Sequence, residues 1–282
     1  MIADKIVRLF TTAAAAFITA ALCSTLRAQD LEPRAYSNSP TGLNFLIAGY
    51  AYANDRVLVD PSLPLDNVSN EEHVEVLAYV RTLNVLGQSA KFDVIVPFTS
   101  LEAKGLVFGM PRSRYVNGFD DPAFRFSMNF IGAPALTAAE FKNYRQDFIL
   151  GASLRVIAPL GQYASDKLVN IDANRWSFKP EIGFSKAFGP WTVELAPAVT
   201  FYTNNDDFFG GHTREVAPIY SVQAGVSYAF KTSCLAGAEC GLLRRRSSDR
   251  HQPFQRLFVA RDVIVRNLDR FAVCNLWNPE TL

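Results

Sequence analysis

Apolar and polar side chains alternate residue by residue along much of the chain. From residue 124 to residue 130, every apolar side chain has an even number and every polar one an odd number. A period of two places unlike side chains on the two faces of a β-strand, whereas a helix repeats every 3.6 residues. The pattern predicts eight strands, at residues 43–53, 73–83, 91–108, 123–130, 147–158, 176–185, 191–201 and 220–228.

The length of these segments and the rhythm of their connections indicate a particular all-β architecture. Several segments run 9 to 13 residues, against about 5 to 6 for a typical globular strand. Long connections at 54–72, 109–122, 159–175 and 203–217 alternate with short ones at 84–90 and 188–190, and the link at 132–146 has room for one helical turn at 136–141. Outer-membrane barrels combine long external loops with short periplasmic turns. We therefore predict an antiparallel up-and-down outer-membrane β-barrel.

The two faces of the predicted strands differ in chemistry. The apolar face is expected to contact outer-membrane lipid, and it carries Val74, Val76, Phe92, Val94, Val96, Phe124, Phe126, Phe148, Leu150, Leu154, Phe178, Ile182, Val193, Leu195, Val199, Val222 and Val226. The polar face is expected to line the lumen, and it carries Glu75, Arg81, Asp93, Arg125, Asn129, Arg155, Lys179, Glu181, Glu194 and Gln223. Two roles remain open for these charges: a path for solutes, or salt bridges that stiffen the barrel.

Charge and cysteine content divide the chain into three parts. Lys5 and Arg8 precede an Ala-rich apolar run that ends in small residues before Ala28, which is typical of a signal peptide at residues 1–28. Residues 29–230 contain no cysteine and carry a net charge of −5, and we assign them to the barrel. Residues 231–282 carry a net charge of +4 and three of the four cysteines. We expect export to the cell outer membrane.

Composition and motifs exclude several classes of function. A mean hydropathy of +0.06 with one apolar run near membrane-helix length, at the N-terminus, excludes a polytopic helical membrane protein. The barrel segment has no clustered basic footprint, so we expect no nucleic-acid partner. The three histidines lie far apart in sequence, and the usual hydrolase, metalloprotease and phosphate-binding motifs are missing from the sequence. We predict no enzyme activity, no cofactor, no metal site and no catalytic residue.

Six short segments resemble a known family. They are QDLEPRAYSN (29–38), NFL (44–46), GFDDP (118–122), APLGQY (158–163), NRWSFKPE (174–181) and NDDFFGG (205–211). On these segments, residues 29–230 resemble the outer-membrane transporter family named for the meta-pathway of phenol degradation. The resemblance implies a barrel of about twelve strands that admits aromatic or other small organic compounds. It supplies no catalytic or binding residues.

The segment after residue 230 departs from the family pattern. Its alternation stops, eight arginines follow within 52 residues, and no terminal aromatic closes the chain. One interpretation is a basic arm with an amphipathic helix at 257–273. Our preferred interpretation is that residues from about 231 onward are read in a shifted frame, which would leave the barrel without its closing strands.

Two other functions remain open at this point. A soluble periplasmic β-barrel binding protein would also alternate, with its apolar face turned inward, and Pro180 and Pro197 inside predicted strands favour it because each lacks a ladder donor. A structural or truncated barrel would insert without conducting. The sequence does not specify the oligomeric state.

Overall fold

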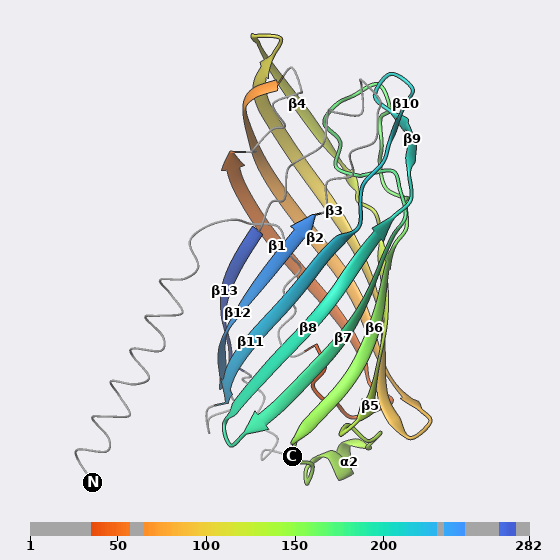
Figure 1. Cartoon of the computed structure of the whole chain (residues 1–282), viewed down its shortest axis with the longest axis vertical. Helices are drawn as coiled ribbons and strands as arrows, with labels where there is room; N and C mark the ends of the chain where they lie inside the picture. The colour runs from red at the N-terminus through yellow and green to blue at the C-terminus, as the bar shows by residue number, and fades with distance from the viewer. Residues whose placement is uncertain (1–34, 57–64, 230–233, 246–264, 275–282) are drawn as a thin grey trace, which may run out of the picture.

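The protein forms one curled antiparallel sheet (Figure 1). The computed structural model describes residues 35–56, 65–229, 234–245 and 265–274. Ten strands follow in the order β1 (Asn44–Arg56), β2 (Leu65–Val85), β3 (Gln88–Val107), β5 (Ala123–Ile131), β6 (Phe148–Ile157), β7 (Ser177–Phe188), β8 (Trp191–Tyr202), β11 (Ile219–Ala229), β12 (Cys234–Arg245) and β13 (Val265–Cys274). Among these described strands, β1 and β13 form the two edges, and no pairing joins them. The prediction of an antiparallel up-and-down outer-membrane fold is confirmed, as a sheet curled like a barrel wall.

All eight predicted strands are present, and tight turns join some of them. Leu86 and Gly87, between β2 and β3, both have positive φ, at 53° and 78°. Phe108 and Gly109 repeat this geometry at the far end of β3, at 50° and 73°. Two successive positive φ angles characterise the type I′ turn, whose twist matches that of paired strands. The turn at 188–190 lies where the sequence predicts it, because Phe188 pairs directly with Trp191.

The region predicted as a long loop at 109–122 is mostly a strand. β4 (Met110–Phe119) pairs with the outer half of β3, while β5 pairs with the inner half of β3. In Figure 1 this hairpin, together with the end of β2 that pairs with β3 as far as Val107, rises above the rest of the sheet. The prediction of a loop was wrong because β4 does not alternate. It stands clear of the barrel wall, where neither face of a strand must be apolar. The loop at 203–217 similarly contains a small hairpin of β9 (Asn205–Phe208) and β10 (His212–Arg214).

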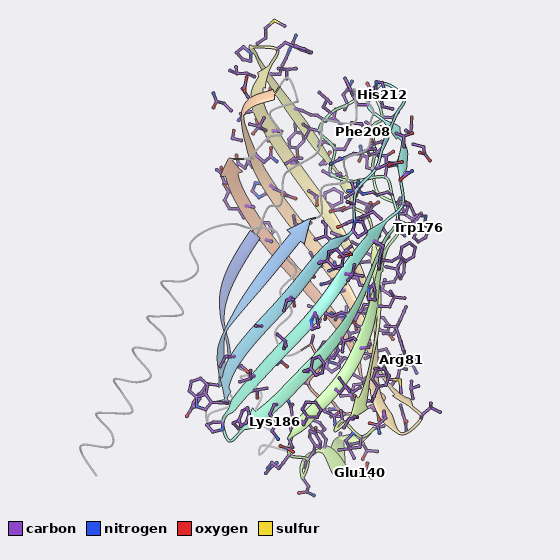
Figure 2. All side chains as sticks on the ribbon, in the orientation of Figure 1. Arg81, Glu140, Trp176, Lys186, Phe208 and His212 are labelled. Carbon is purple, nitrogen blue, oxygen red and sulfur yellow. The ribbon has the colours of Figure 1, made fainter. Side chains whose placement is uncertain are left out.

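The convex face of the sheet is apolar and uncovered. Phe126, Ile182 and Leu195 are 42%, 50% and 44% exposed, although such side chains are normally buried in soluble proteins. Aromatic residues lie at strand ends on this face, including Trp191 and Tyr220. Figure 2 shows Trp176 and Lys186 near opposite ends of β7, which brackets the apolar band between them. This arrangement is that of a lipid-facing barrel wall.

The concave face is built from small and polar side chains. Its buried members include Thr82, Ser89, Asp93, Ser127, Asn129, Ser177, Ser185, Thr192, Ser221 and Ser227. Residues 35–38, which precede β1, pack against this face, and Tyr36 forms a small core cluster with Ala133, Ile149 and Ala196. The inside of the curl is therefore polar and partly filled by the chain's own residues.

The segment after residue 230 differs in part from expectation. β12 pairs with β11 from Leu235 to Arg245, and β13 pairs with β12, so two strands extend the sheet where an irregular segment is predicted. The proposed helix at 257–273 overlaps β13 and is wrong there, because Val265–Cys274 is extended. The remainder of that helix, the signal peptide and residues 246–264 lie outside the described residues. The shifted reading frame stays a prediction.

One short helix lies at the end of the sheet opposite the β3–β4 hairpin (Figure 1). α2 (Ala138–Phe141) falls inside the predicted helical turn at 136–141. It begins with a capping box, in which the backbone N–H of Thr137 donates to Glu140 at 2.8 Å. Over the described part of the chain, no helix has the length and apolar character needed to cross a membrane.

Candidate functional site

A row of charged side chains crosses the concave face from β3 to β7. Asp93, Arg125, Arg155 and Lys179 lie directly opposite one another on four adjacent strands. Arg125 donates from Nε to Asp93 Oδ2 at 2.6 Å, and its Nη2 pairs with the same oxygen. Lys179 Nζ lies 3.3 Å from Glu181 Oε2. Three cations that lie directly opposite one another repel each other. The carboxylates of Asp93 and Glu181 offset this repulsion and so stabilise the row.

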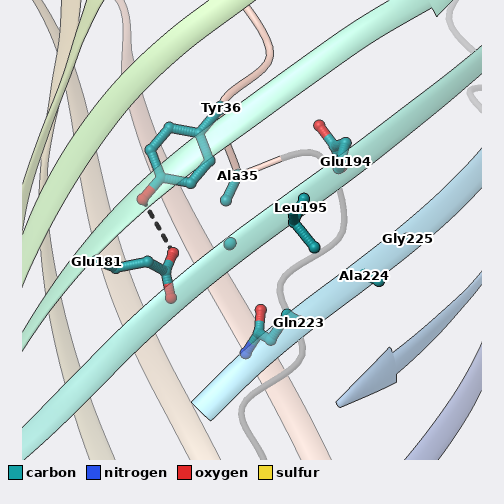
Figure 3. A pocket seen from close by; sticks show the side chains of 9 residues that line it. Ala35, Tyr36, Glu181, Glu194, Leu195, Gln223, Ala224 and Gly225 are labelled. Carbon is teal, nitrogen blue, oxygen red and sulfur yellow. Dashed lines mark hydrogen bonds between the residues drawn. The ribbon is translucent and has the colours of Figure 1, made fainter. Parts of the chain in front are cut away.

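Beside this row, the side chain of Tyr36 packs into a site that fits it, which we call the seat of Tyr36. Its hydroxyl donates to Glu181 Oε1 at 2.9 Å (Figure 3). The same hydroxyl lies 3.2 Å from Ser153 Oγ. Gly151 and Gly183 are directly opposite each other beneath the ring, and a Cβ at Gly183 would overlap the Tyr36 ring. The two glycines therefore make room for the aromatic ring inside the curl.

The backbone around Tyr36 is also held. Asn129 Nδ2 donates to the Tyr36 carbonyl at 3.2 Å, and Lys91 Nζ donates to the Ala35 carbonyl at 2.9 Å. Asn38 Nδ2 donates to the Pro134 carbonyl at 3.1 Å. This N-terminal segment thus narrows the interior at the level of the charged row.

A cavity of about 530 Å³ opens at the outer end of the concave face. Its volume falls in the range of about 300 to 1,000 Å³ that is usual for small-molecule sites. Its apolar lining consists of Val74, Val76, Ile95, Pro97, Ala123, Ile157, Ile171 and Ala173. Its polar lining consists of Asp120, Asp121, Arg155, Asp172, Arg175, Ser177 and Tyr202. Arg155 belongs to both the cavity and the charged row, so the two features are continuous.

Carboxylates gather where the loop 158–176 meets the β4–β5 junction. The backbone N–H of Asp121 donates to Asp172 Oδ1 at 2.7 Å, and that of Gly161 donates to Asp121 Oδ1 at 3.0 Å. Burial, a hydrogen bond with the Asp120 carboxyl and the charge of Asp120 raise the pKa of Asp172 to about 9. Burial also raises the pKa of Asp121. Like charges at close range and poor solvation both disfavour ionisation, so the cluster retains a proton at neutral pH.

Eight of the ten residues predicted to line the lumen share the concave face. The pairing registers place Asp93, Arg125, Asn129, Arg155, Lys179, Glu181, Glu194 and Gln223 on this face. The row and the seat of Tyr36 bring together six of them, while Glu194 and Gln223 lie further along the sheet beside Ala35 (Figure 3).

Glu75 and Arg81 lie on the opposite, convex face, which corrects their prediction. Arg81 pairs directly with Phe92, and Glu75 pairs with Phe98. Val74 and Val76, predicted to contact lipid, consequently line the cavity. The reason is that β2 carries apolar residues at both parities between 74 and 83, so alternation does not select a face there. Its partners β1 and β3 set the register instead.

Sequence reasoning also missed Tyr36 and Asp172. The available signal was the pair of isolated glycines at 151 and 183, because glycine inside a strand often marks the close approach of another group. A second signal was the set of motifs at 118–122, 158–163, 174–181 and 205–211, which meet at the outer end. Asn205 Nδ2, for example, donates to the Tyr163 hydroxyl at 3.0 Å and to the Ala173 carbonyl at 3.1 Å.

The sequence also matches a known protein family. The family model described as "MetA-pathway of phenol degradation" matches residues 54–259. The chain belongs to this family. The match continues past residue 230, so the family pattern reaches through β12 and further than the six resembling segments indicate.

A solved structure shares the fold of this chain. An outer membrane channel from Pseudomonas putida F1 is similar with a TM-score of 0.61 and 20% identity, over 77% of this chain and 78% of the other. At this identity the likeness concerns the fold. No curated protein matches the sequence. Across the described residues, no group of three or more histidine, cysteine or acidic side chains has the geometry to hold a metal ion.

Proposed function

We propose that this protein is an outer-membrane channel that admits small organic compounds, including aromatic ones, by passive diffusion through its lumen. The observation that carries the proposal is the cavity of about 530 Å³ at the outer end of the concave face, which combines an apolar wall on β2 and β3 with a charged wall on the β4–β5 junction, β6 and the loop 158–176. A solute with an apolar body and a polar group can contact both walls. The family description and the fold of the solved relative agree with this role.

The charged row sets selectivity in this mechanism. A solute leaving the cavity meets Arg155 and then the neighbouring cations and carboxylates of the row, which act on charge and size at close range. The seat of Tyr36 lies beside this path and limits the size of solutes that pass.

The uncovered convex face argues against the soluble binding protein. Large apolar side chains on strand after strand are about half exposed, and a soluble protein rarely exposes so extended an apolar patch. Pro180 and Pro197, which favoured the soluble alternative, lie inside β7 and β8, and both strands continue past them.

Two measurements test the proposal in sequence. The mature protein is recovered from an outer-membrane fraction, and its gel mobility is compared unheated and boiled; a heat-dependent shift is expected for a folded barrel. Liposomes containing the folded protein are then placed in solutions of small organic solutes, and swelling above that of protein-free liposomes is expected. A folded, inserted protein that gives no swelling would instead support the structural barrel, and recovery without detergent would support the soluble alternative.

A further inference from the structure

The outer mouth, by which we mean the cavity lining at the outer end of the concave face, contains a buried carboxyl group, that of Asp172. Asp172 is 8% exposed, and its Oδ1 accepts from the Asp121 backbone. Among the described residues, Oδ2 is fully buried and accepts no hydrogen bond from an amide, a hydroxyl or a cationic side chain, so only a carboxyl proton can bridge it to Asp120. Oδ2 faces the space beside Gly161 that the Asp120 backbone also borders. An ionised carboxylate in this position would be poorly solvated, whereas a protonated one can donate to a neighbouring carboxylate.

We propose that Asp120 and Asp172 share one proton and thereby latch the loop 158–176 against the β4–β5 junction, and that loss of this proton releases the C-terminal half of the loop from the outer mouth. This regulation of the mouth rests on the proposed channel function for its biological meaning. The latch itself is a property of the fold.

The position of the pair makes it a latch. The backbone N–H of Asp121 donates to Asp120 Oδ1 at 2.6 Å and to Asp172 Oδ1 at 2.7 Å, which brings the two carboxyl groups together. Asp120 belongs to the junction that follows β4, and Asp172 belongs to the loop, so the shared proton joins two segments 52 residues apart in sequence. Both residues line the cavity, together with Ile171 and Ala173 of the same loop. Movement of these residues would therefore change the width of the cavity.

The surroundings of the pair determine the sign of the pH effect. Groups facing it are Glu72 of β2, Thr99 of β3, Asp121 of the junction, Arg155 of β6, Arg175 of the loop and Tyr202 of β8. The two carboxylates, Glu72 and Asp121, disfavour a second negative charge on the pair, and the two arginines are the cations that line the same cavity. Because the pKa of Asp172 is raised on folding, its proton stabilises the latched state below about pH 9, and the stabilisation is lost as the pH rises through that value.

Limited trypsin digestion tests the latch without requiring conduction. The full folded protein in detergent micelles is digested at pH 7.5 and pH 9.5, and the rate of cleavage after Arg175, half-buried in the cavity lining, is divided by the rate after Arg145, an exposed site outside the mouth. The ratio removes the pH dependence of trypsin. With a pKa of about 9, the deprotonated fraction rises from about 3% to about 76%, so an increase of about 25-fold in the ratio is expected.

Matched variants separate the latch from general loosening. Asp172→Asn carries an amide that donates to Asp120 permanently, so its ratio should stay low at both pH values. Asp120→Asn donates in the opposite direction and should behave likewise, which preserves the test if one variant does not fold. Asp206→Asn changes an exposed carboxylate on β9 and should behave as the unaltered protein.

The outcomes are distinct. A ratio that does not change with pH in the unaltered protein, or a rise in both amide variants equal to that of the unaltered protein, would overturn the latch. Failure of the channel proposal would appear in liposome swelling instead, because cleavage does not depend on permeability.

Discussion

Removing the carboxylate of Asp93 is expected to destabilise the barrel strongly. The Asp93 side chain is 2% exposed and that of its partner Arg125 is 20% exposed, so Asp93→Ala leaves a poorly solvated guanidinium. Arg125 also stands directly opposite Arg155, and the row would then hold three cations with the Asp93 charge removed. Breaking a buried pair by removal of one partner costs about 3 to 5 kcal/mol. We expect a loss of this size in the free energy of unfolding.

The measurement is urea unfolding of the protein in detergent micelles, followed by tryptophan fluorescence. Glu102→Ala is the matched control, because its partner Lys104 is 60% exposed and Glu102 itself 38%; such surface pairs contribute up to about 1 kcal/mol. Arg125→Ala and the double variant complete a cycle, and the double variant should lose less stability than the sum of the two single changes. If Asp93→Ala costs no more than Glu102→Ala, the argument that the row depends on its carboxylates is refuted.

Three further predictions concern the two faces of the sheet. Phe126→Lys should cost about 2 to 4 kcal/mol in lipid vesicles if this face contacts the bilayer core, whereas Tyr115→Lys on the protruding β4 should change stability by less than about 0.5 kcal/mol; equal costs in urea unfolding would contradict lipid contact. In planar bilayers, Arg155→Gln should shift the reversal potential towards cation selectivity, and Arg81→Gln should leave it unchanged; the opposite ranking would return Arg81 to the lumen. Gly183→Val should destabilise the protein by about 1 to 3 kcal/mol because the new side chain displaces the Tyr36 ring. An unfolding midpoint equal to that of the unaltered protein would show that the Tyr36 ring is not packed against Gly183.

The sequence predicted a strand wherever one face had to be apolar and the other polar. Residues 124–130 alternate strictly because Phe126 faces outward and Arg125 inward, and β5 lies where the pattern places it. The same rule does not predict β4. Both faces of β4 meet the same solvent outside the membrane, so its residues need not alternate. The rule is ambiguous for β2, whose inward face at Val74 and Val76 is itself apolar.

The candidate site was only half visible in the sequence. Strand parity collects Asp93, Arg125 and Arg155 on one face, but it does not specify which of them become direct neighbours, because this depends on the register between strands. The pairing of Asp120 with Asp172 is harder still to foresee, since it depends on how a loop folds back over the mouth. Alternation reports the face of a residue, whereas register and loop geometry decide its contacts.

The ladder between β2 and β3 also has a consequence for how the molecule reaches its native state. The two strands pair from Leu65 with Val107 to Val85 with Gln88, around a two-residue turn. Contacts between residues close in sequence incur a small entropic cost of closure and form early, whereas joining distant segments is slow. We therefore expect this hairpin to act as the folding nucleus on which β1 and β5 assemble, and substitutions at its Leu86-Gly87 turn to slow folding more than they speed unfolding.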